Sequence, residues 1–556
     1  MKMKKYTIGL DFGTKSGRAV LVDVSNGRIL AAAVKEYTHG VMDECLPDGV
    51  TRLGVDWCLQ NPNDYIEVLE TVIPSVMTET GVHKEDVIGI SMDFTACTIL
   101  PIYKDGTPLC TKEKYIGRPH AYVKLWKHHA AQEEADRINS ILKKQGSSIL
   151  DRLGGRISSE ILLPKVWQIL NEDPEIYNEM DEILEAPDWL NFLMTGAKKR
   201  SISTAGYKAM YDEGQGYPAK EFFGLFEKRL ENLVEDKLST AISKIDESFG
   251  SLNEEWAEKL GLLPGTAVGT SIIDAHAGLP GCGITKPGQM MLIIGTSSVQ
   301  TVLSERPYSK AGIMGGVKGG IMPGYYALES GLAAVGDQFE WFVNNCVPEY
   351  YYEEARNQNQ NIHQYLTEKA QKLAAGQSGL IALDWWNGNK TPYTNSELSG
   401  VLIGLNINTK PEEIYRAFIE ATAYGTRLIM DMFEEAGAGI DEIFACGGIA
   451  HKNSMLMQIY SDVTNREIKI SAVDQTAALG AAMYAAVAAG SGRGGYDSIF
   501  EAAEKMSSVK EKVYKPDRKS HDTYSELYEQ YKILKDMFNP SINNVLIKLH
   551  EIKKNF

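Results

Sequence analysis

The sequence has few of the residues that build a metal centre, a disulfide framework or a membrane segment. Seven cysteines are scattered over 556 residues, and no two have Cys-x-x-Cys spacing. The scattered positions of the cysteines argue against a structural zinc site and against a fold held together by disulfides. They favour a reduced, cytoplasmic location. The N-terminus reaches Asp11 after too few apolar residues to form a signal-peptide core. The longest uncharged apolar run, residues 476–490, is too short to span a bilayer and is predicted to be a buried helix.

Positive charge is also in deficit. The chain has 57 Lys and Arg against 73 Asp and Glu, which gives a net charge of −16. This balance argues against nucleic acid or an anionic membrane as the main partner. A small anionic ligand remains compatible with it, because glycine-rich loops and a metal ion bind phosphate locally. The length is sufficient for two large domains.

Two distant stretches of the chain look like copies of one structural device. They are Ile8-Gly-Leu-Asp-Phe-Gly-Thr-Lys-Ser16 and Met291-Leu-Ile-Ile-Gly-Thr-Ser-Ser298, each followed by a second apolar strand. A Gly-Thr tip between two strands points backbone N–H groups and a hydroxyl outward, which suits a phosphate. Two such tips facing each other would hold a nucleotide from both sides. The duplication therefore predicts an ATP-using enzyme with two related domains.

The patterning along the chain indicates a mixed α/β fold. Residues 6–35 alternate in period two and predict an antiparallel ribbon, residues 119–147 are predicted to be helical, and residues 411–436 predict a long helix. Pro264-Gly265 punctuates the chain before a strand that ends at Asp274. We place the domain boundary there, giving an N-terminal domain of residues 1–270 and a C-terminal domain of residues 271–556 that ends in a helical extension.

Two carboxylates are candidates for chemistry. Asp11 ends a buried strand two residues before Gly13-Thr14, where a phosphate carrying Mg²⁺ would arrive, and Mg²⁺ prefers oxygen ligands. Asp274 follows an apolar strand at the predicted domain junction, where it could take a proton from an alcohol during phosphoryl transfer. The alternatives are an Asp that caps its own turn and an Asp that caps a helix.

Glycines and small polar residues form the candidate phosphate sites. Gly447-Gly448 follows a predicted strand and leads to Asn453 at a predicted helix start, and two glycines let a backbone approach a ligand closely. An ordinary hairpin turn and a tight strand-to-helix turn remain the alternatives at these positions. The candidate nucleotide-binding residues are Thr14, Lys15, Gly295, Thr296, Gly447, Gly448 and Asn453.

In combination these motifs resemble a known family. Asp11-Phe-Gly-Thr14, Asp274-Ala-His-Ala-Gly278, Ile294-Gly-Thr-Ser297 and Gly447-Gly-Ile-Ala-His-Lys-Asn453 are similar to the motifs of the FGGY carbohydrate kinases, in the actin/hexokinase/Hsp70 superfamily. Further stretches resemble the L-ribulokinase branch of that family, among them Asp93-Phe-Thr-Ala-Cys-Thr98 and Leu383-Asp-Trp-Trp-Asn-Gly-Asn-Lys-Thr-Pro392.

The resemblance implies two ribonuclease-H-like domains around a central cleft, with the sugar mainly on the first and ATP with Mg²⁺ mainly on the second. It implies phosphorylation of L-ribulose to L-ribulose 5-phosphate in arabinose catabolism. Asp274 would be the catalytic base and Asp11 the metal-associated carboxylate. The positions that would line the sugar site are Ala96, Trp126, Lys208, Asp274 and Glu329. Lys15 departs from some relatives, which have Gly-Ser-Asp-Ser at residues 13–16, and it adds a positive charge there.

Two other functions are compatible with the sequence. One is a kinase of the same family for another ketopentose or pentitol, such as xylulose or ribitol. The other is a nucleotide-switched binding protein related to actin and Hsp70, although the sugar-side residues Trp126, Lys208 and Glu329 would then have no role. The expected partners are therefore a sugar and ATP, without nucleic acid or membrane, and a homodimer is one assembly to consider.

Overall fold

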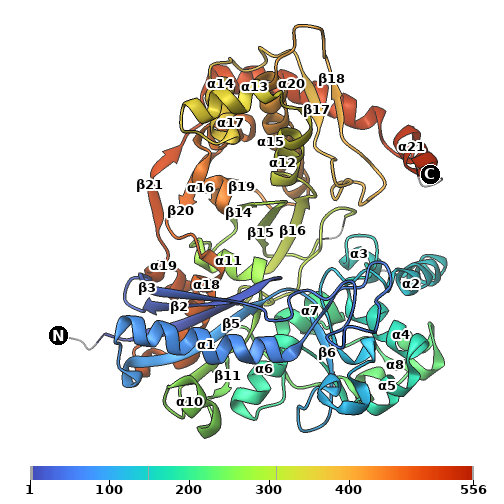
Figure 1. Ribbon diagram of the computed structural model, residues 1–556, viewed down its shortest axis with the longest axis vertical. Coiled ribbons are helices and arrows are strands. Elements are labelled where there is room, and N and C mark those ends of the chain that lie inside the picture. Colours follow the sequence, from blue (N-terminus) through green and yellow to red (C-terminus); the bar gives the residue numbers. More distant parts are fainter. Residues whose placement is uncertain (1–3, 148, 309, 554–556) are drawn as a thin grey trace.

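The computed structural model describes residues 4–147, 149–308 and 310–553, and it is built from two sheet-centred halves that lie one above the other in Figure 1. The N-terminal half is drawn in blue to green, and most of the second half in yellow to red. The mixed α/β class predicted from the sequence is confirmed. None of the helices in the described part of the chain combines the length and apolarity needed to cross a bilayer.

The first sheet has the strand order β11-β12-β5-β1-β2-β3. Strands β1 (Tyr6–Phe12), β2 (Ser16–Asp23) and β3 (Ile29–Glu36) are antiparallel, as the alternating pattern predicted. Strands β5 (Val87–Phe94) and β12 (Ala267–Gly269) continue the sheet in parallel, and β11 (Ser248–Ser251) closes it in antiparallel. Every residue of β5 is buried, as expected for a central parallel strand covered on both faces.

The second sheet repeats this arrangement. Its order is β16-β15-β14-β19-β20-β21, with β14 (Gly288–Ile294), β15 (Ser298–Ser304) and β16 (Tyr326–Leu332) antiparallel. Strands β19 (Ile440–Cys446) and β20 (Glu467–Ser471) follow in parallel and β21 (Val509–Tyr514) in antiparallel. The duplication inferred from two short motifs therefore extends to six strands in each half.

Two helices lie between the sheets and share one core with both. They are α11 (Asp274–Gly281) and α18 (Thr476–Ala489). A Cβ on Gly9 of β1 would lie 1.9 Å from the carbonyl oxygen of Ala478, so α18 lies directly on the first sheet. This position confirms the predicted buried helix, and it explains why residues 476–490 are apolar all round.

Outer helices cover the other face of each sheet. Helix α1 (Pro62–Thr80) packs on β2 and β3, and α15 (Pro411–Glu435) packs with α17 (Ser454–Thr464) in the second half. The other α-helices are α2 (Gln132–Gln145), α3 (Ile149–Arg152), α4 (Leu162–Glu172), α5 (Pro174–Glu179), α6 (Ala186–Thr195), α7 (Ile202–Ala209), α8 (Lys220–Gly224), α9 (Leu233–Lys237), α10 (Glu254–Leu260), α12 (Gly336–Cys346), α13 (Glu349–Asn357), α14 (Ile362–Gln371), α16 (Gly448–Lys452), α19 (Ile499–Met506), α20 (Arg518–Met537) and α21 (Val545–Lys553).

Two boundaries predicted from the sequence, one of a helix and one between domains, can be compared with the structure. The predicted helix over 119–147 is wrong in its first half, because residues 123–124 form strand β7 (Val123–Lys124) and pair with β4 (Leu59–Gln60). With β6 (Ile99–Ile102) and β8 (Glu182–Glu185) these strands form a small sheet of the first half. The predicted domain boundary at 270/271 falls between β12 and β13 (Ile272–Ile273), both of which pair with β5. That boundary stays a prediction.

Candidate active site

The first Gly-Thr hairpin joins β1 to β2 and carries a charged pair. Asp11 and Arg18 are cross-strand partners, with Arg18 Nε 3.2 Å from Asp11 Oδ2. The N–H of Gly13 donates to the carbonyl of Ser16 at 3.0 Å and closes the tip. The indole N–H of Trp126 donates to Thr14 Oγ1 at 3.1 Å.

The second hairpin joins β14 to β15 through a loop that is one residue shorter between the last paired residues. The N–H of Gly295 donates to the carbonyl of Ser297 at 2.9 Å. The start of α12 holds this tip, since the N–H of Val335 donates to Thr296 O at 2.9 Å and that of Gly336 donates to Gly295 O at 3.0 Å.

A cavity of about 880 Å³ opens beside the second hairpin. Among its lining residues are Gly295, Thr296, Gly448 and Asn453, which lie far apart in the sequence and which we predicted to contact a nucleotide. Other lining residues come from α12, α14 and α15, and sequence reasoning missed them. One of them, His363, lies 3.2 Å from Tyr415 Oη through Nδ1 and 3.3 Å from Glu340 Oε2 through Nε2.

The two adjacent glycines differ in how closely they are packed. Gly447 has φ +94°, and a Cβ there would lie 2.4 Å from the carbonyl oxygen of Ile294 at the end of β14. Gly448 begins α16, and no atom lies within 4 Å of its Cβ position. The side chain of Asn453 accepts a hydrogen bond from the N–H of Leu456 at 3.0 Å and so begins α17. Gly447 therefore allows the ends of β14 and β19 to lie close together, and Gly448 leaves its backbone open to the cavity.

Three carboxylates influence one another at the ends of the neighbouring strands β1, β5 and β13. Asp11 and Asp93 are partners on the parallel strands β1 and β5. Asp93 is fully buried, and apart from its neighbour Asp11 its oxygens have no hydrogen-bond partner among the described residues. Burial, and then the charges of Asp11 and Asp274, raise the pKa of Asp93 well above its usual range. In the described ranges no group of three or more His, Cys, Asp or Glu residues is arranged to hold a metal ion.

Asp274 is the first residue of α11. Burial raises its pKa to about 7; the charges of Asp11 and Glu329 also raise it, while a hydrogen bond from the N–H of Ala275 opposes them. A carboxylate with this pKa titrates near neutrality, where a general base is most useful.

Glu329 on β16 is held in its ionised form. His276 Nε2 lies 3.1 Å from Glu329 Oε2. Burial alone would raise the pKa of Glu329, but the hydrogen bond and charge of His276, with Lys390 and Lys208, lower it to about 2. The charge of Lys208, on α7 of the first half, also lowers the pKa of Asp274. Lys208 therefore influences both Asp274 and Glu329 of the second half.

The loops that carry Ala96 and Trp126 are joined by one buried lysine. Lys165 Nζ donates to the carbonyl of Cys97 at 2.7 Å and to that of Leu125 at 2.9 Å. Burial lowers the pKa of Lys165. Ala96 is half-buried in the loop after β5.

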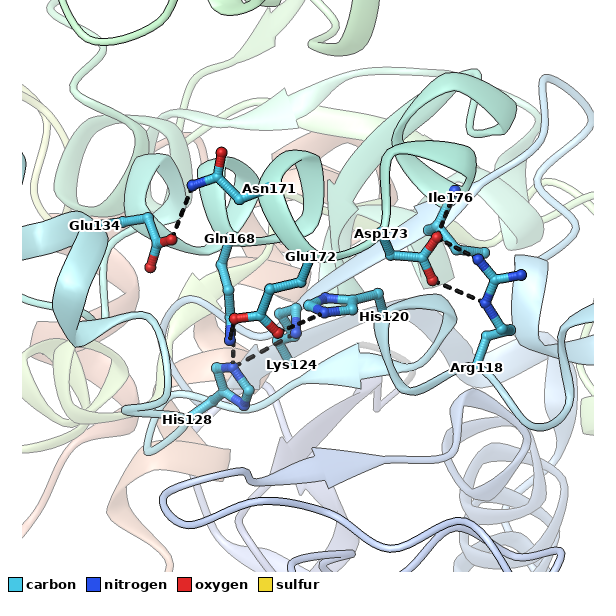
Figure 2. A network of polar contacts seen from close by, with 10 residues as sticks. All are labelled: Arg118, His120, Lys124, His128, Glu134, Gln168, Asn171, Glu172, Asp173 and Ile176. Atoms are coloured by element: carbon cyan, nitrogen blue, oxygen red, sulfur yellow. Dashed lines mark hydrogen bonds and ion pairs between the residues drawn. The ribbon is translucent and has the colours of Figure 1, made fainter.

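A buried polar network lies next to the strand that leads into the Trp126 loop (Figure 2). Lys124 Nζ lies 3.5 Å from His128 Nε2, which lies 2.9 Å from Gln168 Oε1, and His120 Nε2 lies 3.0 Å from Glu172 Oε2. Burial lowers the pKa of Lys124 to about 7. Lys124 is the last residue of β7 and precedes Trp126 by two residues. The network therefore holds the end of β7, where the Trp126 loop begins.

Some predicted residues are not brought together. Lys15 is exposed on the first hairpin and does not line the cavity beside the second. Asp93 and Lys165 were not among the predicted site residues. Asp93 could have been found, since it ends a buried strand as Asp11 does, whereas the two carbonyl partners of Lys165 depend on tertiary structure alone.

The two halves of the chain match a described family. Residues 6–281 match the N-terminal domain of the FGGY family of carbohydrate kinases, and residues 290–489 match its C-terminal domain. The chain is 50% identical to a ribulokinase of Anoxybacillus flavithermus and 51% identical to one of Halalkalibacterium halodurans, covering 99% of this chain and 98% of each relative. It is 40% identical to a ribulokinase of Mycolicibacterium smegmatis, covering 99% of this chain and 97% of the relative.

Solved structures show the same fold at lower identity. The xylulose kinase from Rhodospirillum rubrum superposes with a TM-score of 0.80 at 21% identity, covering 97% of this chain and all of the other. A glycerol kinase from Plasmodium falciparum with ADP superposes with a TM-score of 0.75 at 17% identity, covering 96% and 98%. The chain therefore has the two-domain actin/hexokinase-like fold, and it belongs to the FGGY family of carbohydrate kinases.

Proposed function

We propose that this kinase transfers the terminal phosphoryl group of ATP to L-ribulose and forms L-ribulose 5-phosphate in arabinose catabolism. The relatives at 40–51% identity over nearly the whole chain are named ribulokinases. The observation that carries the proposal is the position of Asp274, a half-buried carboxylate of pKa about 7 within electrostatic reach of Asp11, Glu329 and Lys208.

In this proposal Asp274 accepts the proton of the 5-hydroxyl as that oxygen attacks the phosphorus atom. Glu329 and Lys208 hydrogen-bond the sugar, and the loops of Ala96 and Trp126 complete its site. The two hairpin tips, with Gly447 and Gly448, hold the phosphate chain, because phosphoryl transfer depends on positioning and charge neutralisation. Closure of the two halves would exclude water and so limit hydrolysis of ATP.

The first hairpin has donors that fit Mg²⁺. Asp11 and Asp93 are adjacent carboxylates, and the oxygens of Asp93 have no other partner in the described part of the chain. Hard oxygen donors of this kind, together with phosphate oxygens, are what Mg²⁺ prefers. When bound there, the ion would neutralise negative charge on the phosphates. The ion pair with Arg18 of β2 holds the Asp11 side chain in place.

The test is ADP release measured with a panel of acceptors that includes L-ribulose, xylulose and ribitol. We expect L-ribulose to give the highest kcat/KM, with little ADP released when sugar is absent. A higher kcat/KM for xylulose or ribitol would mean that this compound, and not L-ribulose, is the substrate. ATP hydrolysis independent of any sugar would favour the nucleotide-switched binding protein. The cytoplasmic location and the homodimer stay predictions, and size-exclusion chromatography with light scattering tests the latter.

A further inference from the structure

The loop over residues 384–393 is the conspicuous motif that the proposed function leaves unused. It follows β17 (Ile381–Leu383) and contains two tryptophans. Trp385 is buried in the core of the second half, and the ring of Trp386 lies 4.7 Å from that of Phe418. Both tryptophans therefore serve packing, and another residue of the loop is free to face the site.

Hydrogen bonds fix this loop to α20 at one end and to β16 at the other. Tyr531 Oη donates to Asp384 Oδ1 at 2.8 Å at one end. At the other end Asn389 Nδ2 donates to the carbonyl of Thr391 at 2.7 Å, and Thr391 Oγ1 lies 2.7 Å from Ser330 Oγ. This bond fixes the loop to β16, although the side chains of Ser330 and its neighbour Glu329 point to opposite faces of the strand.

This fixed loop places the ammonium group of Lys390 next to Gly331. Lys390 Nζ would lie 3.6 Å from a Cβ on Gly331, which is an ordinary van der Waals distance. Residues two apart in a strand point to the same face, so Lys390 lies on the face of β16 that carries Glu329. Its charge contributes to the low pKa of Glu329. Lys390 is exposed, and its ammonium has no hydrogen-bond or ion-pair partner in the described part of the chain.

The same face of the second sheet carries α11. Glu329 and Gly331 pair with Thr301 and Val299 of β15, and these pair with Met291 and Ile293 of β14. Directly paired residues share a face. A Cβ on Gly278 of α11 would lie 3.1 Å from Met291 Sδ, so the helix that begins at Asp274 packs on this face.

We propose that Lys390 is a further catalytic residue, whose ammonium contacts the phosphoryl group during its transfer from ATP to the acceptor hydroxyl. This inference rests on the proposed function. An unpaired lysine acts as a compact positive charge, and the transferred group carries negative charge on its three outer oxygens. Lys390 forms and breaks no covalent bond. The phosphorus–oxygen bond to ADP breaks, the bond to the sugar oxygen forms, and Asp274 receives the proton.

The test compares Lys390→Met, which removes the charge at similar length, with Lys390→Arg, which keeps it. We expect kcat of Lys390→Met to fall by about 10²-fold, the scale for losing one electrostatic stabiliser of a transition state. The KM for the sugar should change little, and Lys390→Arg should recover part of kcat. Lys512→Met, at another exposed lysine, is the matched control and should leave kcat and KM unchanged. Thermal denaturation checks that all three variants are folded.

Two results would overturn the inference about Lys390. One is an unchanged kcat in Lys390→Met. The other is a raised sugar KM at normal kcat, which would mean that Lys390 only orients Glu329. Wild-type turnover of L-ribulose separates this failure from failure of the proposed function. If the wild type prefers another acceptor, the same kcat comparison on that acceptor decides the role of Lys390.

Discussion

The two Gly-Thr hairpins share one strand arrangement but differ in their tips and in their chemistry. When Gly13 is aligned with Gly295, Asp11 in the first hairpin corresponds to Ile293 in the second. Their partners on the neighbouring parallel strands differ in the same way, since Asp11 pairs with Asp93 and Ile293 pairs with Cys446.

In the proposed function this difference separates two tasks. The tips close differently, because the N–H of Gly13 donates to the carbonyl three residues ahead (Ser16, 3.0 Å) and that of Gly295 to the carbonyl two residues ahead (Ser297, 2.9 Å). Only the first hairpin adds carboxylates, while the second adjoins the large cavity. We propose that the duplication supplies two backbone tips for one phosphate chain, and that the carboxylates of the first hairpin supply the charge for catalysis.

The largest effect should come from Asp274, the proposed general base. We expect Asp274→Asn to lower kcat by about 10²–10⁴-fold, the usual contribution of a positioned base, with a smaller change in sugar affinity. Steady-state kinetics with L-ribulose and ATP measure both.

The pH profile provides the control for Asp274. A base must be deprotonated, and burial raises the pKa of Asp274 to about 7, so wild-type kcat/KM should fall as the pH drops through this value. The residual activity of Asp274→Asn should lack that fall. Near-normal turnover in the variant would remove Asp274 from the role of base.

The asymmetry between the hairpins predicts unequal effects at equivalent positions. Asp11→Asn should lower kcat by about 10²-fold and raise the Mg²⁺ concentration needed for half-maximal rate, because a metal-associated carboxylate is lost. Ile293→Val, the matched change in the second hairpin, removes one methylene and should leave kcat and the Mg²⁺ dependence nearly unchanged. Equal losses in both variants would contradict the division of tasks.

Much of this comparison could be predicted from the sequence, since the strand–Gly-Thr–strand motif, Asp11, Asp274 and the Gly447-Gly448 turn are all local patterns. Residues whose role depends on distant neighbours could not be predicted. Lys165 reads as an ordinary helical lysine until the fold places the carbonyls of Cys97 and Leu125 around it. Residues 123–124 have a helical context in the sequence, and only pairing with β4 makes them a strand.

On the sugar side we expect Lys208→Ala to raise the KM for L-ribulose by about tenfold, because a charged hydrogen-bond donor to a sugar hydroxyl contributes roughly 1.5–3 kcal/mol. The KM for ATP should stay near the wild-type value, since Lys208, on α7, does not line the cavity beside the second hairpin. Initial rates with each substrate varied in turn test this. An unchanged sugar KM would refute the assignment of Lys208.

The smallest effect concerns the glycine pair at the end of β19. Gly447→Ala places a Cβ 2.4 Å from the carbonyl oxygen of Ile294 at a positive φ, which costs on the order of 1–3 kcal/mol. We expect a lower melting temperature and a several-fold higher KM for ATP, since the strain falls beside the second hairpin. Gly448→Ala has open space and should preserve the melting temperature. Equal melting temperatures for the two variants would show that the close approach of β14 and β19 is not required.

The most direct test of the shared grip is a crystal structure with L-ribulose, Mg²⁺ and a non-hydrolysable ATP analogue. We predict phosphate contacts from the backbone of both tips, at residues 13–14 and 295–296. We also predict that a carboxylate oxygen of Asp274 lies about 2.6–3.2 Å from the 5-hydroxyl, the reach of a general base. Phosphates held by one tip alone, or an Asp274 carboxylate turned away from the sugar, would contradict the account.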